Sequence, residues 1–105
     1  MLRVTQEVRG GWCVVGVTGR ADVLSASELE AGLCAAIQQN PQVVVDLSSV
    51  DYISSCGLRA LLQSARAAQA GNVRFVVCSL SAPVKKVFDI SRLGDILEVQ
   101  AKLPC

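Results

Sequence analysis

Apolar residues recur with two spacings along the chain, and the changes between them mark the expected strands and helices. Short valine-rich runs are typical of strands and occupy residues 3–8, 12–19, 42–48, 73–79 and 95–100. Apolar residues three or four positions apart are typical of helices and occupy residues 25–39, 55–70 and 81–90. The predicted order is β-β-α-β-α-β-α-β.

Residues that typically begin or end strands and helices stand at the boundaries between the expected strands and helices. Gly10 and Gly11 predict a tight turn, so the first two strands are expected to form a hairpin. Ser25 with Glu28 three residues later has the spacing of a capping box, which indicates the start of the first helix. Pro41 is expected to end that helix.

The same spacings predict which side chains are buried. The expected inward residues are Leu29, Leu33 and Ile37 in the first helix, Leu58, Leu61, Leu62 and Ala65 in the second, and Val84, Val87 and Phe88 in the third. Residues 43–45 and 73–77 lack polar alternation, so we expect central strands covered on both faces, with the first two helices packed across them. The predicted fold class is α/β, with a mixed, mostly parallel β-sheet packed with α-helices.

Composition and charge narrow the classes of protein to consider. The chain has 105 residues, of which 51% are hydrophobic and 18% charged, so we expect one folded domain. Ten basic residues against nine acidic ones leave a net charge of +1 without a basic stripe, which argues against nucleic-acid binding. No apolar run suits a membrane span or a signal peptide, so we expect a soluble, cytoplasmic protein without a membrane partner.

The cysteines give no indication of a disulfide framework or a metal site. They are Cys13, Cys34, Cys56, Cys78 and Cys105, an odd number without a CxxC pair, and the chain has no histidine. Cys13, Cys34 and Cys78 fall in apolar elements and are expected to be small buried residues. We also expect no cofactor, because the chain has no Gly-rich phosphate loop, so any ATP chemistry would belong to a partner.

Small polar residues gather where the second helix begins, just after a buried strand. Such a helix start favours anions, and a serine there can cap the unpaired N–H groups. Ser54 or Ser55 is therefore either an N-cap or part of a site. Gly57 either allows close packing or lets another molecule approach the backbone.

The stretch VVVDLSSVDYISSCGLRALL, residues 43–62, resembles the signature of the STAS domain family, the bacterial anti-sigma factor antagonists. In that signature a valine-rich strand ending in Asp-Leu-Ser leads through an Asp-Ser-Ser/Thr-Gly-Leu loop into a helix. VTGRADVLSASEL, residues 17–29, is similar to the family's Gly-x-x-Asp loop, and residues 73–99 are similar to its last strand, helix and strand. The resemblance covers essentially the whole chain and implies a single STAS domain at residues 1–105.

This resemblance implies a phosphorylatable protein ligand that is not an enzyme. In the family the unmodified form binds an anti-sigma factor that is also a serine kinase, which frees a sigma factor for transcription. Phosphorylation of one serine ends the binding, and a serine phosphatase restores it. An alignment without gaps places the phosphorylated serine on Ser55, with Ser54 as the alternative.

The chain departs from the family pattern at two positions of this loop. Ser54 stands where the family has an acidic residue, and Cys56 stands where it has a second hydroxyl. The missing acid affects recognition by a kinase, whereas the acceptor hydroxyl is retained. The residues expected to contact partners are Asp22, Ser54, Ser55, Cys56, Gly57, Leu58 and Arg59.

Other interpretations of these residues stay open. Asp22 is either a helix-entry residue or a partner contact, and Arg59 is either solvated or close enough to Ser55 to touch a phosphate. Cys56 is alternatively the reactive thiol of an enzyme, although the usual histidine base is missing. STAS domains also serve as protein-binding or small-ligand-binding subunits of sensory or transport assemblies without a phosphorylation cycle. The oligomeric state is not predicted.

Overall fold

The computed structural model describes residues 2–104 and contains the elements in the predicted order. The strands are β1 (Leu2–Arg9), β2 (Trp12–Ala21), β3 (Gln42–Ile53), β4 (Arg74–Cys78) and β5 (Glu98–Gln100). The helices are α1 (Ala26–Gln39), α2 (Ser55–Ala70) and α3 (Ala82–Ser91), followed by the short 3-10 helix η1 (Leu93–Asp95). Because the end of η1 and the turn that follows it take up residues 95–97 of the predicted last strand, β5 is shorter than expected. None of the helices in residues 2–104 has the length and apolarity needed to cross a membrane.

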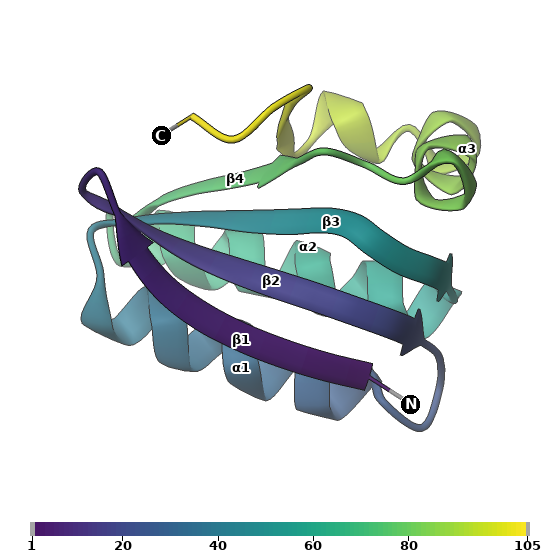
Figure 1. Cartoon of the computed structure of the whole chain (residues 1–105), viewed down its shortest axis with the longest axis horizontal. Coiled ribbons are helices and arrows are strands. Elements are labelled where there is room, and N and C mark those ends of the chain that lie inside the picture. Colours follow the sequence, from purple (N-terminus) through teal and green to yellow (C-terminus); the bar gives the residue numbers. More distant parts are fainter. Residues whose placement is uncertain (1, 105) are drawn as a thin grey trace.

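All five strands join in one sheet whose spatial order follows the sequence, β1-β2-β3-β4-β5 (Figure 1). β1 and β2 pair antiparallel through a turn in which Gly10 and Gly11 have φ values of 57° and 82°, which side chains rarely allow. The other neighbouring strands pair in parallel. The predicted hairpin and the mixed, mostly parallel sheet are therefore confirmed.

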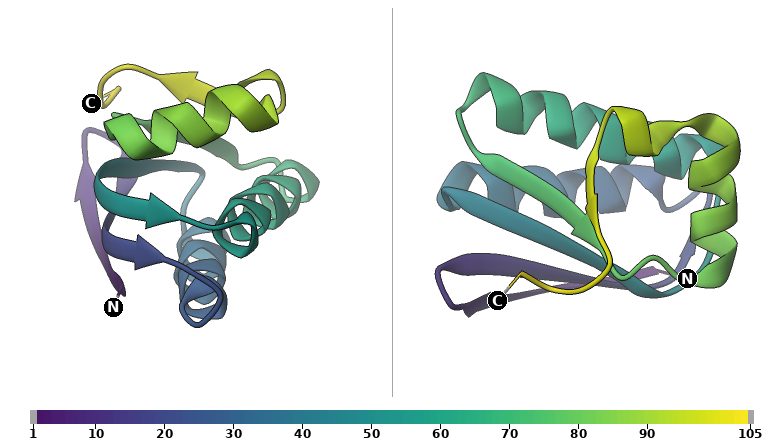
Figure 2. Two further views of the ribbon diagram at one scale, coloured as in Figure 1. Left: turned by 90° about the vertical axis from the view of Figure 1, so that its right-hand side faces the viewer. Right: turned by 90° about the horizontal axis from the view of Figure 1, so that it is seen from above.

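Helices α1 and α2 lie side by side on one face of the sheet, and α3 lies beside β3 (Figure 2). The main core fills the space between this face and the helices, and it includes Leu29, Leu33, Ile37, Val84 and Phe88 as predicted. Val87 is only half-buried and packs at the border of this core. β4 ends before β3 does, and α3 is anchored beyond that point, where Ser81 Oγ donates to the Val50 carbonyl over 2.6 Å.

The opposite face of the central strands carries a second, smaller cluster. It consists of Trp12, Val14, Val44, Val76 and Cys78, with Leu103 of the C-terminal segment packed against it. Residues 43–45 and 76–77 are fully buried, so the prediction of two central strands is confirmed. At residues 73 and 74 it is wrong, because Val73 precedes β4 and is only half-buried, and Arg74 is exposed.

The buried face of α2 differs from the predicted leucine face. The residues buried there are Gly57, Ala60, Leu61, Ser64 and Ala68. The predicted Leu58, Leu62 and Ala65 are only half-buried. The physical reason is that α2 packs against both α1 and the sheet, so small residues occupy the closest approach and the larger ones lie at its border.

The strand predicted at residues 42–48 extends further, because β3 continues to Ile53 where a loop was expected. Its second half pairs with the end of β2, with Arg20 opposite Tyr52 and Ala21 opposite Ile53. Register shifts along β2 accommodate this extension. The ends of β2 and β3 therefore reach the same edge of the sheet, where α1 and α2 begin.

Candidate functional site

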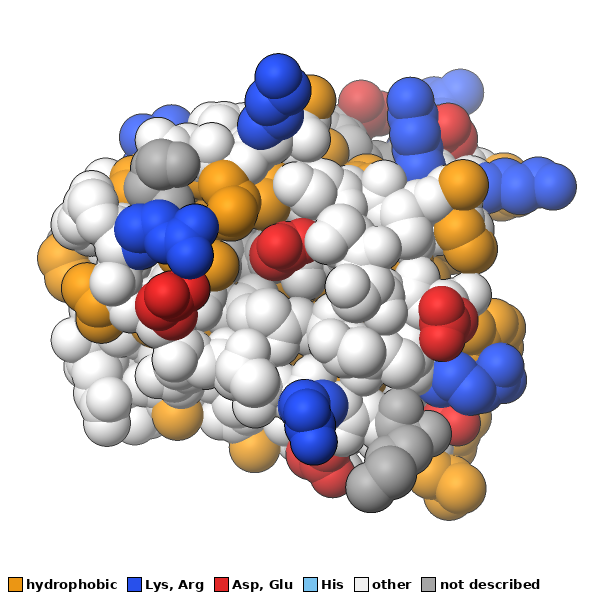
Figure 3. Space-filling view, in the orientation of Figure 1, with side chains coloured by type: hydrophobic (Ala, Val, Ile, Leu, Met, Phe, Trp, Pro, Cys, Tyr) orange, Lys and Arg blue, Asp and Glu red, His pale blue; other side chains and the backbone are white. Residues whose placement is uncertain are grey.

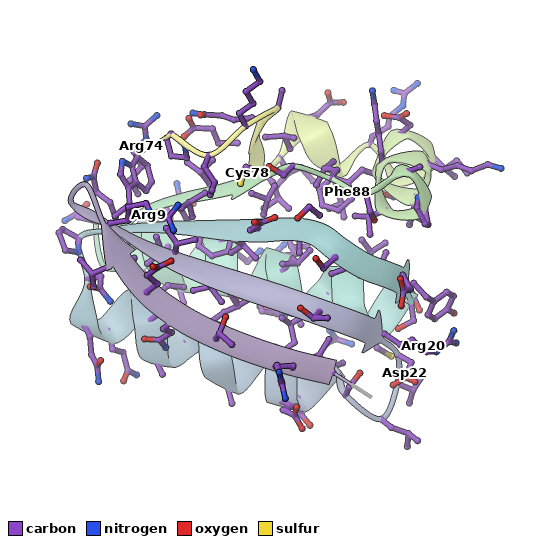
Figure 4. The ribbon with its side chains drawn as sticks, in the orientation of Figure 1. Arg9, Arg20, Asp22, Arg74, Cys78 and Phe88 are labelled. Atoms are coloured by element: carbon purple, nitrogen blue, oxygen red, sulfur yellow. The ribbon has the colours of Figure 1, made fainter. Side chains whose placement is uncertain are left out.

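The predicted site residues lie where β2 and β3 end and α1 and α2 begin. The Ser54 N–H donates to the Ala21 carbonyl over 2.8 Å, which ties the two strand ends together. Figure 4 shows Arg20 and Asp22 at this end of the sheet, on the side of β2. The loop around Asp22 therefore lies beside the loop around Ser54.

Ser54 is the N-cap of α2 and is turned into the protein. Its backbone is extended, its side-chain oxygen accepts from the Gly57 N–H over 3.2 Å, and the residue is only 9% exposed. A serine cap of this kind contributes about 0.5–2 kcal/mol to helix stability. The Ser54 hydroxyl is therefore engaged within the fold.

Ser55 is the first residue of α2 and is exposed. It lies in the first turn, where the helix dipole presents about half a positive charge and an anion is favoured. The adjacent Cys56 is half-buried. Of the two candidate acceptors, Ser55 is the one that another protein can reach without displacing a helix cap.

Gly57 is needed for packing within the domain. A Cβ atom at this position would lie 2.7 Å from the Ala21 carbonyl oxygen and 2.8 Å from Ile53 Cγ1, both closer than van der Waals contact. The residue is also buried in this chain, which supports the packing interpretation of this glycine. Gly57 supports the site by letting α2 sit against the end of β2.

Asp22 organises the entry to α1, as the helix-entry interpretation predicted. Its Oδ1 accepts from the Leu24 and Ser25 N–H groups, each over 3.1 Å, and lies 3.0 Å from Ser25 Oγ. The hydrogen bond with the Ser25 side chain is the largest of the effects that lower the pKa of Asp22. The carboxylate therefore stays charged at the edge of the site.

The capping box predicted for Ser25 and Glu28 is wrong. Ser25 is the N-cap of α1, but its side chain makes no cap hydrogen bond to the helix. Instead its hydroxyl lies 2.7 Å from the Arg20 carbonyl and accepts from the Asp22 N–H over 3.0 Å. Ser25 thus closes the loop between β2 and α1, and Asp22 satisfies N–H groups at the helix start.

Leu58 and Arg59 differ in how far they face solvent. Leu58 is half-buried and packs against the main core, so it mainly seats α2. Arg59 is exposed and forms no ion pair with any residue from 2 to 104. A shallow groove between the starts of α1 and α2 is lined by Val23, Ala26, Ser27, Glu30, Cys56, Arg59 and Ala60. Arg59 and Cys56 are therefore available at the surface beside Ser55.

Sequence reasoning missed the exposed apolar residues around the site. Val23, Leu24 and Tyr52 are 70%, 90% and 41% exposed, although each is a large apolar or aromatic residue. The Arg20 guanidinium lies 4.5 Å from the centre of the Tyr52 ring, which holds both side chains at the end of the sheet. The signal in the sequence is the pair Val23-Leu24, which lies between Asp22 and Ser25 outside any strand or helix pattern. Exposed apolar residues gathered at one site indicate a protein contact surface.

The described residues contain no group of three or more potential ligands that could hold a metal ion. Cys13 and Cys78 are buried as predicted, and burial raises the pKa of the Cys13 thiol. The prediction for Cys34 is wrong, since it is half-buried at the border of α1, and Cys105 lies outside the described residues. On the face drawn in Figure 3, charged side chains are scattered among neutral ones and form no basic stripe.

The chain is similar in sequence to a known family and to curated proteins. The family model described as STAS domain matches residues 3–104. BtrV of Bordetella bronchiseptica is named a putative anti-sigma factor antagonist. It is 33% identical to this chain over 99 residues, which cover 93% of this chain and 85% of BtrV. The anti-sigma-B factor antagonist of Bacillus subtilis is 28% identical over 88 residues, 84% of this chain and 81% of the relative.

Solved structures share the fold. An anti-sigma factor antagonist from Mycobacterium paratuberculosis superposes with a TM-score of 0.88 at 24% identity and covers 98% of this chain and 88% of its own. The Bacillus antagonist SpoIIAA has been solved unphosphorylated and phosphorylated, with TM-scores of 0.75 and 0.69 at 22% identity over 92% of this chain. The alignments cover 87% and 90% of the two SpoIIAA chains.

Proposed function

The chain belongs to the STAS domain family, and we propose that it is an anti-sigma factor antagonist that works by partner switching. The STAS proteins that antagonise anti-sigma factors are regulatory binding proteins and not enzymes. In this proposal the unmodified chain binds an anti-sigma factor serine kinase in the cytoplasm and so frees a sigma factor. Phosphorylation of Ser55 by that kinase ends the binding, and a serine phosphatase restores it.

Two adjacent serines lie in different environments, and this difference is the main support for Ser55 as the phosphate acceptor. Ser55 is exposed at the first position of α2, whereas Ser54 is buried and its oxygen caps the helix. Phosphorylating Ser54 would break the cap and force a charged group out of a buried site. Phosphorylating Ser55 adds the group in solvent and needs no rearrangement of the fold.

The surroundings of Ser55 favour a large effect of phosphate on binding. A phosphoserine carries a charge of about −1.5 to −2 at neutral pH. The exposed Val23, Leu24 and Tyr52 nearby suit a contact from which water is excluded. Burying a new charge in such a contact requires its desolvation and can cost several kcal/mol, with a tenfold loss of affinity for each 1.4 kcal/mol. The phosphate itself is tolerated by the chain, because it stands at a helix N-terminus.

The loss of the family's acidic residue changes the site without removing its acceptor. Ser54 provides the helix cap that the acidic residue would otherwise offer, because both side chains have an oxygen acceptor. The position lacks a negative charge, so a kinase for this chain must recognise the loop through other groups. The exposed Arg59, which lines the groove beside Cys56, is one charged side chain available for this recognition.

The proposal is tested by variants of the two serines, mixed with the anti-sigma factor kinase of the source organism. Ser55→Ala should abolish the mass gain on incubation with kinase and ATP, yet retain binding, because alanine is also small and neutral. Ser55→Asp should lower the affinity, because the carboxylate introduces a negative charge into the contact, while the thermal midpoint stays nearly unchanged. Intact-mass spectrometry and calorimetric titration provide the two readouts.

Ser54→Ala is the matched control. It should retain phosphorylation, although it loses part of the helix cap and therefore some stability. If Ser54→Ala eliminates the phosphate and Ser55→Ala does not, the acceptor assignment is wrong. If neither serine accepts phosphate, the chain is a STAS module without a phosphorylation cycle.

A further inference from the structure

Strand β1 forms one edge of the sheet and pairs only with β2 (Figure 1). Every residue from 5 to 9 is exposed, so neither a helix nor a loop of the described chain covers this part of the edge. The N–H and C=O groups on the outer side of such a strand are free to pair with another strand. β1 is therefore the long edge of the sheet, since the opposite edge strand β5 spans only Glu98–Gln100.

The side chains of β1 alternate between the two faces of the sheet. Val4 points to the helices, because its side chain fills the space beside Gly32 of α1. Arg3, Thr5 and Glu7 therefore point to the opposite face, which carries no helix. The Thr5 hydroxyl donates to the carbonyl of Gly16, its partner on the neighbouring strand β2, over 3.4 Å.

Self-pairing of β1 about a twofold axis allows only some registers. Along β1, every second residue points its backbone N–H and C=O away from β2, and the residues between them point these groups towards β2. In an antiparallel pair, two facing residues must be of the same kind. Residue numbers of facing partners must therefore add up to an even value. Two such registers pair seven-residue segments, one over residues 2–8 with facing numbers adding up to 10, and one over residues 3–9 with facing numbers adding up to 12.

Charge separates these two registers. The register over residues 2–8 places Arg3 opposite Glu7 of the second copy, twice by symmetry, with Thr5 facing Thr5 on the axis. The register over residues 3–9 places Arg3 opposite Arg9, so like charges face each other twice. Glu7 is compatible with the first register although it already contacts Arg9, because Arg9 occupies only Oε2, at 2.9 Å. Its Oε1 is available to Arg3.

In the register over residues 2–8, the side chains on the helix side of the sheet also allow the two copies to approach closely. Val8, which is 73% exposed, would lie beside Leu2 of the second copy and lose contact with water. On α1, Ala31 and Ala35 are exposed and flank the Gly32 position that contacts β1. Their small side chains leave room for α1 of a second copy beneath the extended sheet.

From these observations we infer that β1 is a docking surface for a second copy of this chain. The two copies pair antiparallel over residues 2–8, with Arg3 of each copy facing Glu7 of the other, and form one continuous sheet. This inference does not rest on the proposed phosphorylation switch, since Ser55 and its neighbours take no part in the pairing.

Charge reversal across the twofold axis tests the inference on the full chain. Arg3→Glu alone would place two Glu–Glu pairs in the interface, and Glu7→Arg alone would place two Arg–Arg pairs there. Each should raise the dimer dissociation constant at least about tenfold, because favourable pairs become repulsive ones. The double variant Arg3→Glu/Glu7→Arg restores opposite charges and should restore the dimer. Sedimentation velocity over a range of protein concentrations measures the oligomeric state.

Arg66→Glu is the matched control, because this exposed arginine lies on α2 away from β1 and its reversal should leave the dimer unchanged. Circular dichroism melts confirm that each variant is folded. A wild-type chain that is monomeric up to millimolar concentration would overturn the inference. So would a dimer that both single reversals leave intact, or one that the double variant fails to restore.

Discussion

At the scale of single residues, Ser54, Ser55 and Gly57 are near neighbours with three different environments. Ser54 is a buried cap, Gly57 is packed against Ala21, and Ser55 faces solvent. The two buried residues fix where α2 begins, and this fixes where Ser55 is presented. Changes at residues 54 and 57 should therefore act on stability, whereas changes at residue 55 should act on binding.

Gly57→Ala should destabilise the fold. The added Cβ would overlap the Ala21 carbonyl and Ile53, and overpacking of this kind costs about 1–3 kcal/mol. Replacing glycine by alanine within a helix returns at most about 1 kcal/mol, so the net effect is a loss. Thermal unfolding should show a midpoint lower by several degrees.

Gly94→Ala is the control for this prediction, because a Cβ there meets no atom within 4 Å. Its stability should stay within about 0.5 kcal/mol of the wild type. Equal midpoints for the two variants would show that the close packing of α2 against β2 is wrong.

At the scale of elements, the site is an arrangement of two strand ends and two helix starts. β3 extends beside β2 to Ile53, and the Ser54 N–H bonds to the Ala21 carbonyl. Asp22 and Ser25 then close the short loop that leads into α1. The two loops of the candidate site are therefore held by backbone and side-chain hydrogen bonds at both ends.

The Asp22 carboxylate gives the start of α1 a dependence on pH. Its pKa lies below the ordinary value of 3.8 in the folded chain, chiefly because of the bond with the Ser25 hydroxyl, so the unfolded chain binds its proton first as pH falls. The carboxylate thus stabilises the fold above pH 3.8, and this contribution is lost as the pH falls through the folded pKa. Asp22→Asn keeps the shape and removes the titration.

Urea unfolding of wild type and Asp22→Asn between pH 3 and 6 measures this contribution. The wild type should be the more stable protein at pH 6, and the difference should shrink towards pH 3. A difference that does not change with pH would contradict the role assigned to the carboxylate.

Element boundaries could be predicted well where local chemistry decides them. Gly10-Gly11, Pro41 and the helix at residues 55–70 were placed correctly from turn residues and apolar spacing. The capping box predicted at Ser25 is absent because Asp22 accepts the Ser25 N–H that Glu28 would bond, and the Ser25 hydroxyl turns to the Arg20 carbonyl. The prediction of a leucine face on α2 was wrong, because spacing alone does not reveal that α2 contacts both α1 and the sheet. These two contacts favour small residues on the buried side of α2.

At the scale of the whole molecule, the order of elements and the central position of the valine strands followed from the sequence, but the surface of the site did not. Residues 43–45 are apolar without interruption, which only a strand covered on both faces tolerates. Val23, Leu24 and Tyr52 also look like core residues by type. Their exposure depends on where the loop and the strand end lie in the folded chain.

Leu24→Ala should weaken binding to the anti-sigma factor without loss of stability. The side chain is 90% exposed, so its removal costs the isolated chain little, whereas a partner would bury it beside Ser55. We expect an affinity lower by roughly three- to tenfold in calorimetric titration. Ile90→Ala is the control, since Ile90 is 77% exposed on α3, outside the proposed contact surface. Equal affinities for the two variants would show that the loop containing Leu24 is not part of the interface.

The central claim is that the charge state of Ser55 decides partner binding. It is tested most directly by titrating the anti-sigma factor kinase of the source organism with two preparations, the unmodified chain and the singly phosphorylated chain. Fragment mass spectrometry locates the phosphate in the second preparation. We predict that the phosphate is on Ser55 and that it lowers the affinity at least about tenfold, which corresponds to about 1.4 kcal/mol. A phosphate on Ser54, or a phosphate on Ser55 that leaves the affinity unchanged, would contradict this account.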